Sequence, residues 1–162
     1  MTANEPSPER LEKRARNVLL HQLARSMKTE EQLRQILVKR EIPSEIAEPL
    51  LAKFVEVQLI DDLVFAKAFV ASRIAAGGKS RAAIARELRS KGVRDSDSAL
   101  ALESLDSEKE QELANGLAMK RYSQLSKLDH DVRYRRLSGY LARRGFSSSV
   151  ISQAIRNAQA AG

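Results

Sequence analysis

Apolar side chains recur at helical spacing along most of the chain, and the pattern is clearest between residues 58 and 73. There the apolar residues fall at positions i, i+1, i+4 and i+5, on one face of a helix: Phe65, Ala66, Phe69 and Val70. Asp61 precedes this run, so we expect its side chain to cap the helix and Asp62 to place a negative charge in the first turn. Phe65 and Phe69 are expected to be the largest buried anchors of this helix.

Similar apolar runs, separated by proline, glycine and capping residues, predict helices nearly everywhere and no strand. The expected helices cover residues 8–25, 29–40, 44–57, 61–75, 80–91, 95–105, 107–125, 129–144 and 150–160. Hydroxyl caps are expected at Ser7, Thr29, Ser44, Ser80 and Ser107, and within Ser147 to Ser149 for the last helix. Gln32 and Glu110 each follow a cap by three residues, which is the spacing of a capping box.

Two helices end in a basic residue followed by glycine and an apolar residue. Gly92 and Gly145 therefore suit the left-handed position that follows a helix, where the absence of a Cβ removes the steric cost. In the helix that ends before Gly145, the residues expected to be buried are Tyr134, Leu137 and Leu141.

The pattern repeats at intervals of about 50 residues. Three sets of residues align with one another: Leu33, Leu37, Arg40, Glu41 and Ile42; Ile84, Leu88, Lys91, Gly92 and Val93; and Leu137, Leu141, Arg144, Gly145 and Phe146. The chain is thus expected to be an all-α, elongated, curved array of three three-helix repeats, at residues 8–57, 58–105 and 106–160, after a disordered tail at residues 1–7. The alternative is one compact bundle, in which the helices resemble one another only because amphipathic helices generally do.

Composition supports helix and excludes some chemistry. The chain has 162 residues, of which 43% are hydrophobic and only 4% aromatic, with seven Gly, four Pro and no Cys. Disulfides, cysteine-bound zinc and thiol nucleophiles are therefore excluded. Because the sequence has neither a membrane-spanning apolar run nor a signal peptide, we expect a cytoplasmic protein that does not enter membranes. We also expect a monomer.

Charge gives the stronger lead to function. The net charge is +7, with nine Lys and Arg against five Asp and Glu in residues 1–40, and eight against two in residues 121–162. Such a protein is attracted to polyanions or to acidic protein surfaces. The outer side of the first helix carries Arg10, Lys13, Arg14 and Arg16. The candidate residues for binding a partner or DNA are Arg25, Arg34, Lys39, Arg40, Arg73, Arg133, Arg136, Arg143, Arg144 and Arg156.

The sequence offers no active site and no cofactor site. His21 and His130 lie in different helices, and the acids that flank His130 are better explained as helix-start residues than as metal ligands. The Gly77–Gly78–Lys79–Ser80 segment lacks the spacing and the preceding strand of a phosphate-binding loop. Few aromatic residues are available to stack on unpaired bases.

Several motifs together resemble the RecX family of bacterial recombinase regulators. They are Leu-Ile-Asp-Asp-x-x-Phe-Ala-x-x-Phe-Val-x-x-Arg at 59–73, Ile-Ala-x-Glu-Leu-x-x-Lys-Gly-Val at 84–93 and Leu-x-Arg-Arg-Gly-Phe at 141–146. The resemblance implies a non-enzymatic protein that lies in the groove of the RecA–DNA filament and usually suppresses strand exchange, ATP hydrolysis and the coprotease activity of the SOS response. Glu41 and Gln58 depart from the pattern, because the family often has glycine at both positions.

Two other functions remain to be weighed. The segment from Ser80 to Leu105 could act as a helix-turn-helix in a regulator that binds DNA directly, although its second helix is acidic and poor in base-reading residues. A metal-dependent nuclease would need converging carboxylates, which the spacing does not supply.

Overall fold

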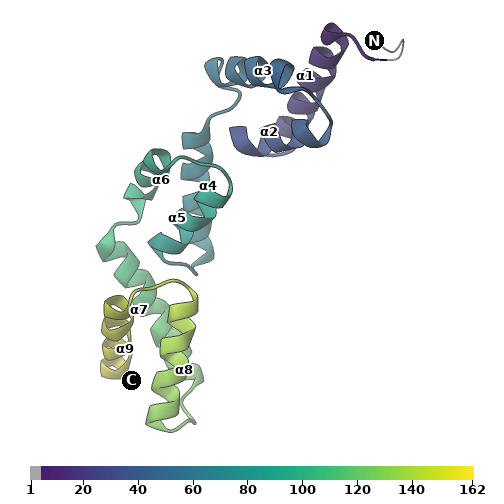
Figure 1. Cartoon of the computed structure of the whole chain (residues 1–162). Coiled ribbons are helices and arrows are strands. Elements are labelled where there is room, and N and C mark those ends of the chain that lie inside the picture. Colours follow the sequence, from purple (N-terminus) through teal and green to yellow (C-terminus); the bar gives the residue numbers. More distant parts are fainter. Residues whose placement is uncertain (1–4) are drawn as a thin grey trace.

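The computed structural model describes residues 5–162, and the chain is helical throughout this range (Figure 1). The helices are α1 (Pro8–Arg25), α2 (Glu30–Lys39), α3 (Ser44–Glu56), α4 (Asp62–Ala76), α5 (Arg81–Ser90), α6 (Asp95–Ala101), a short 3-10 helix η1 (Leu102–Ser104), α7 (Ser107–Gln124), α8 (His130–Arg143) and α9 (Ser148–Ala161). Of the predicted disordered tail, residues 1–4 lie outside the described residues. None of the described helices is both long and apolar enough to cross a membrane.

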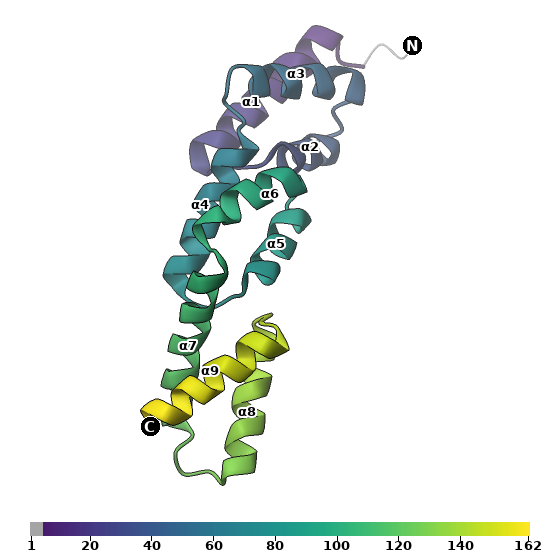
Figure 2. The ribbon, with the colours of Figure 1, turned by 90° about the vertical axis from the view of Figure 1, so that its left-hand side faces the viewer.

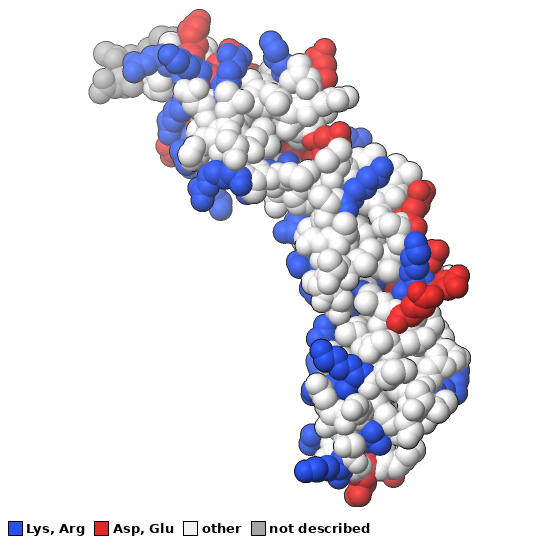
Figure 3. Space-filling model, turned by 180° about the vertical axis from the view of Figure 1, so that it is seen from behind, with Lys and Arg blue, Asp and Glu red and all other residues white. Residues whose placement is uncertain are grey.

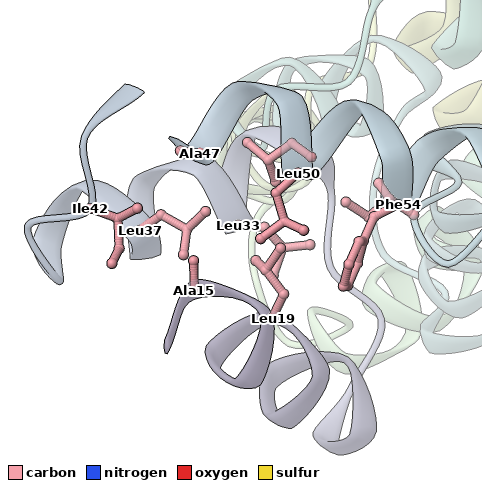
Figure 4. Packing of buried hydrophobic residues seen from close by; sticks show 10 residues of the cluster. Ala15, Leu19, Leu33, Leu37, Ile42, Ala47, Leu50 and Phe54 are labelled. Carbon is pink, nitrogen blue, oxygen red and sulfur yellow. The ribbon is translucent and has the colours of Figure 1, made fainter. Parts of the chain in front are cut away.

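The helices form three units in a row, α1–α3, α4–α6 and α7–α9, which confirms the predicted all-α array (Figures 1 and 2). Each unit has its own apolar core. In the first core, shown in Figure 4, Leu33 and Leu37 of α2 meet Leu50 and Phe54 of α3. Ile60, beyond the expected boundary at residue 58, also belongs to this core. The row of units is elongated and bends along its length (Figure 3).

Most of the predicted caps are present. The side chains of Ser7, Thr29, Asp61, Ser80 and Ser147 accept hydrogen bonds from the first turns of their helices, and Thr29 forms the predicted capping box with Gln32. Two expected caps are wrong. Pro43 stands at the cap position of α3, so Ser44 is already helical. Asp106 caps α7 in place of Ser107, and this leaves the Glu110 carboxylate free for another contact.

The first helix of the middle unit packs through small residues. Ala66 and Val70 are fully buried, whereas Phe65 and Phe69 are only partly buried and stack with ring centroids 6.2 Å apart. The phenylalanines are therefore not the buried anchors that the sequence predicted; small side chains let the helix axes approach closely and leave the rings at the edge of the core. Tyr134, predicted to be buried, is 43% exposed.

Adjacent units meet through similar contacts at both junctions, although the donor to the carbonyl is a hydroxyl at the first and a backbone amide at the second. At the first junction the Thr29 hydroxyl donates to the Lys91 carbonyl over 2.6 Å, and the Glu30 amide donates to the Asp62 carboxylate over 2.9 Å. At the second junction the Ser80 amide donates to the Arg144 carbonyl over 3.0 Å, and the Arg81 amide donates to the Glu110 carboxylate over 2.6 Å. A carboxylate from the following unit thus caps the middle helix of the preceding one.

The glycines at these junctions allow the close approach. Gly92 and Gly145 have φ of 88° and 93°, and a Cβ there would overlap the Glu31 side chain or lie 2.5 Å from the Ser80 Oγ. Glu41, at the equivalent position of the first unit, also has a positive φ of 60°, but it takes part in neither of the two junctions between the described units. The steric need for glycine is thus absent at residue 41, and only the conformational cost remains.

Candidate partner-binding surfaces

Basic side chains are spread unevenly over the array. In Figure 3, Lys and Arg follow the inner edge of the bend from the first unit to the third, while Asp and Glu gather on the outer side of the middle unit. A concave edge of one charge strengthens the attraction of an opposite charge brought against it.

The candidate basic residues of the first unit, Arg25, Arg34, Lys39 and Arg40, divide into exposed and paired side chains. Arg25, Lys39 and Arg40 are exposed at the ends of α1 and α2, and they form no ion pair with any described residue. Arg34, in contrast, is held by three carboxylates within the first unit, with N to O distances of 2.6 to 2.9 Å to Glu30, Glu31 and Glu48. Its guanidinium therefore serves to join α2 to α3.

Arg34 and the carboxylates around it stabilise one another in their charged forms. Hydrogen bonds from Arg34 lower the pKa of Glu48 below its usual value, and hydrogen bonds from Gln35 and Arg34 do the same for the pKa of Glu31. Hydrogen bonding to Glu48 in turn raises the pKa of Arg34.

Arg73 lies at the C-terminal end of α4 and makes two contacts within the middle unit. Its guanidinium lies 4.7 Å from the Phe69 ring centroid and pairs with Glu87 over 2.8 Å. Glu87 also pairs with Lys79. Burial raises the pKa of Glu87, but the hydrogen bonds from Lys79 and Arg73 outweigh burial and lower it. The side chain of Arg73 remains 37% exposed, so part of it faces solvent.

The candidate arginines at the C-terminal end also divide into paired and exposed side chains. This set, called the C-terminal stripe, consists of Arg133, Arg136, Arg143, Arg144 and Arg156. Arg133 lies 3.2 Å from the Tyr122 ring centroid and donates to the Tyr122 carbonyl over 2.6 Å. Arg144 lies over Tyr140 and donates to the carbonyl of Gly78 over 2.9 Å, which links the third unit to the second. Arg136 and Arg143 are exposed, as is Arg156, which donates to Gln153 on its own helix.

A basic groove on the first unit was not recognised as a site from the sequence. It has a volume of about 750 Å³ and is lined by Arg10, Lys13, Arg14, Asn17, Val18, His21, Gln22 and Arg40. The spacing of Arg10, Lys13 and Arg14 along one side of α1 was the available signal. The contribution of Arg40, from the end of α2, could not be foreseen without the fold.

Other chemistry finds little support among the described residues. Within residues 5–162, no group of three or more His, Cys, Asp or Glu side chains is arranged to hold a metal ion. In α6, the expected second helix of a helix-turn-helix, Ser98 and Ala101 are buried, and Asp95 forms an ion pair with Arg89. This helix therefore presents acidic rather than base-reading side chains.

Comparisons with known proteins agree with the three-unit architecture. Residues 15–54, 61–102 and 108–155 match the family models of the first, second and third three-helix domains of RecX. The chain is 43% identical to the regulatory protein RecX of Streptomyces coelicolor over 154 residues, covering 95% of this chain and 81% of that protein. It is 41% identical to the regulatory protein RecX of Thermobifida fusca over 150 residues, covering 93% and 81%.

Solved structures show the same fold. The crystal structure of RecX from Lactobacillus salivarius superposes with a TM-score of 0.86 at 20% identity, covering 94% of this chain and 99% of that one. A second crystal structure, of a regulatory protein RecX, gives a TM-score of 0.82 at 30% identity over 95% of this chain and 81% of that one.

Proposed function

Because this chain belongs to the RecX family of regulatory proteins, we propose that it binds the RecA–DNA filament and modulates the recombinase without catalysing a reaction of its own. The direction we propose is inhibition of strand exchange, of RecA-dependent ATP hydrolysis and of the SOS coprotease activity. The protein would act in the cytoplasm, as a monomer and without a cofactor.

The observation that carries this proposal is the bent row of three units with basic side chains along its inner edge (Figure 3). A row of units in which each contacts only its neighbours presents a long surface, and a long surface suits a long partner. A filament groove is such a partner, because it offers the same acidic or phosphate groups at regular intervals. We infer that the row spans adjacent recombinase subunits and obstructs the rearrangements that accompany ATP hydrolysis.

The proposed contact residues are the exposed basic side chains at the two ends of the row. They are Arg25, Lys39 and Arg40 in the first unit, and Arg136, Arg143 and Arg156 in the third. Arg73 contributes its exposed part from the middle unit. Arg34, Arg133 and Arg144 already have partners within the chain, and their proposed part is to hold the neighbouring surface in place.

The test is RecA-dependent ATP hydrolysis on single-stranded DNA, measured with the protein present at less than one molecule per RecA. We expect the hydrolysis rate to fall, because one row would obstruct more than one subunit. A gel shift with DNA alone is run beside it. An unchanged ATPase together with a sequence-specific shift would contradict the filament proposal and favour the direct DNA-binding regulator.

A further inference from the structure

The middle unit has a groove between α5 and α6, two helices that lie side by side in Figure 2. Its volume is about 560 Å³, which falls in the range of about 300 to 1,000 Å³ that is usual for small-molecule sites. The third unit contributes Glu110, Gly145 and Ser147 to the lining. The α5–α6 groove is thus built by two units, and none of the proposed filament contacts lines it.

Two alanines stand in this groove where the first unit has an ion pair. In the alignment of the repeats, Ala85 takes the place of Arg34. Ala99 likewise takes the place of Glu48. In the first unit Arg34 and Glu48 join α2 to α3 over 2.6 Å, whereas the two alanines line the groove and are too short to meet across it. The middle unit therefore leaves open a space that the first unit bridges with its own side chains.

One polar group of the lining lacks a hydrogen-bond partner. Ser98 is only 4% exposed, and its Oγ has no partner within residues 5–162. The equivalent residues of the other two units, Ala47 and Ile151, are buried and apolar. A buried hydroxyl without a hydrogen bond destabilises the folded chain, so packing alone does not explain a serine here. Because Ser98 lines the groove, a molecule bound there can supply the missing partner.

The charged side chains of the lining carry both signs. Arg89 and Asp95 already pair with each other over 3.1 Å. Arg81 forms no ion pair with a described residue, and its guanidinium makes one long hydrogen bond, of 3.4 Å from Nε to the Leu102 carbonyl. Glu110 accepts the Arg81 amide through Oε2, and its Oε1 has no donor among the described residues. One cation and one carboxylate oxygen are therefore available in the groove.

We propose that the α5–α6 groove binds a small zwitterion with an apolar side chain, the chemistry of a free apolar amino acid. The carboxylate would pair with Arg81 and accept from the Ser98 hydroxyl, and the ammonium group would donate to Glu110. The apolar side chain would lie on the apolar part of the lining, which consists of Ala82, Ala85, Ala99 and Leu102.

Such a ligand would join two units of the row, because Arg81 belongs to the second unit and Glu110 to the third. It would thereby stabilise the second junction. This inference goes beyond the filament proposal and does not rest on it, since it concerns the chain and a small molecule alone.

The experiment uses L-phenylalanine as the probe and follows the backbone amides of the full, isotope-labelled chain by NMR. Three analogues each remove one feature: N-acetyl-L-phenylalanine has no ammonium group, L-phenylalanine amide has no carboxylate, and glycine has no apolar side chain. We expect L-phenylalanine to shift the amides of Ser98, Ala99 and Glu110, with a dissociation constant of about 1 mM or below. Each analogue should bind about tenfold more weakly, because it leaves one group of the groove without its partner.

The test variant Ala85→Arg/Ala99→Glu introduces the pair that joins α2 to α3 in the first unit. It keeps the net charge and should reduce binding by about tenfold or more, because the new side chains occupy the groove. The matched control is Ala71→Arg/Ala75→Glu, which adds the same two residues to exposed positions of α4 outside this groove. The control should bind like the wild type, and circular dichroism checks that both variants fold.

Two single variants test the polar contacts. Arg81→Gln should bind L-phenylalanine no better than its amide, because the carboxylate has lost its cation. Ser98→Ala should weaken binding while the melting temperature stays the same or rises, since it removes an unpartnered buried hydroxyl. A serine that matters only for folding would instead lower the melting temperature and leave binding unchanged.

Several results would overturn the proposal. They are the absence of amide shifts at about 10 mM probe, which is about ten times the highest expected dissociation constant, and unchanged binding in Ala85→Arg/Ala99→Glu. Equally tight binding of N-acetyl-L-phenylalanine amide, which has neither charge, would overturn it in favour of an uncharged peptide segment. RecA is absent from these measurements, so their failure and that of the filament proposal are distinguishable.

Discussion

The hydroxyl of Thr29 donates a hydrogen bond to the carbonyl of Lys91, 62 residues further along the chain, and this contact joins the first unit to the second. Thr29 is completely buried, as a polar side chain can be when its hydrogen bonds are satisfied. Ser80 and Arg144 hold equivalent positions at the second junction, where the donor is a backbone amide. The spacing of the two basic ends therefore depends on two small polar junctions.

The first prediction concerns the fit at the first junction. Gly92→Ala introduces a Cβ that would overlap the side chain of Glu31, and it also places alanine at a φ of 88°. Gly77→Ala is the matched control, because Gly77 also has a positive φ, of 65°, but nothing lies within 4 Å of the added Cβ. We expect the free energy of unfolding to fall by about 1 kcal/mol in the control, from backbone conformation alone.

In Gly92→Ala the loss should be larger, about 2 to 4 kcal/mol, because a clash adds to the conformational cost. Urea denaturation gives both values, and small-angle X-ray scattering shows whether the row changes its bend. If both variants lose the same unfolding free energy, the junction accommodates the added Cβ without an energetic penalty.

The local parts of the fold could be predicted from the sequence. Caps such as Ser80 and glycines such as Gly145 act within one helix end, so their residue types and spacing are sufficient. Contacts between distant residues could not be predicted. Glu110 has the spacing of a capping box, yet its carboxylate accepts from the amide of Arg81 in another unit.

The candidate site shows the same limit. Charge counts place basic residues at both ends of the chain, but they do not separate exposed arginines from those that support packing. Arg34 belongs to a helix with two acids in its first turn, and the third carboxylate, that of Glu48, comes from the next helix. Arg133 stacks on Tyr122 because the loop before α8 turns the helix back along α7, and no local pattern reports this turn.

The second prediction tests the carboxylate that joins the first two units. Burial raises the pKa of Asp62, and the hydrogen bond from the Glu30 amide opposes this effect. A raised pKa means that the folded state holds its proton to higher pH than the unfolded state does. The ionisation of Asp62 therefore lowers the free energy of unfolding as pH rises from the unfolded-state pKa of about 3.9 through the higher pKa of the folded state.

Asp62→Asn keeps an oxygen acceptor and removes the charge. We expect it to leave the unfolding free energy at pH 7 unchanged or slightly higher. Asp62→Ala removes the acceptor and should cost about 1 kcal/mol, as for the loss of a helix cap. Thermal unfolding between pH 3 and pH 7 distinguishes the two variants; equal destabilisation by both would show that the charge itself is needed.

The third prediction concerns the three carboxylates around Arg34. The pKa of Glu48 and that of Glu31 are lowered on folding, so their contribution to stability is present above the unfolded pKa of about 4.3. It is lost as pH falls through the folded pKa values. Arg34→Met should lower the unfolding free energy by about 1 kcal/mol at pH 7, since the pairs are partly exposed to solvent.

The difference between wild type and Arg34→Met should shrink below pH 4, where the carboxylates become protonated and no longer need the guanidinium. Arg16→Met is the control, because the pair of Arg16 with Glu12 is about half exposed and should matter little at any pH. Chemical denaturation at pH 3.5 and pH 7 makes the comparison. If the difference in unfolding free energy between wild type and Arg34→Met is the same at both pH values, Arg34 stabilises the fold through packing of its aliphatic part.

The last prediction separates arginines that bind a partner from arginines that hold the fold. Arg136→Ala/Arg143→Ala removes two exposed charges without breaking a described contact outside their own helix, so the melting temperature should stay the same. Arg133→Ala/Arg144→Ala removes the same charge but also two stacking contacts and the hydrogen bonds to the carbonyls of Tyr122 and Gly78. We expect this second variant to lose about 1 to 3 kcal/mol of stability.

Filament binding is then measured for both variants by RecA-dependent ATP hydrolysis at several salt concentrations, below the melting temperature of the weaker one. Arg136→Ala/Arg143→Ala should inhibit ATP hydrolysis more weakly than the wild type. Its inhibition should also depend less on salt, because ions screen the long-range attraction between charges that this variant has lost. If inhibition and its salt dependence are unchanged in Arg136→Ala/Arg143→Ala, the exposed part of the C-terminal stripe is an ordinary solvated face. The binding surface would then have to lie on the first unit or along α4 and α7.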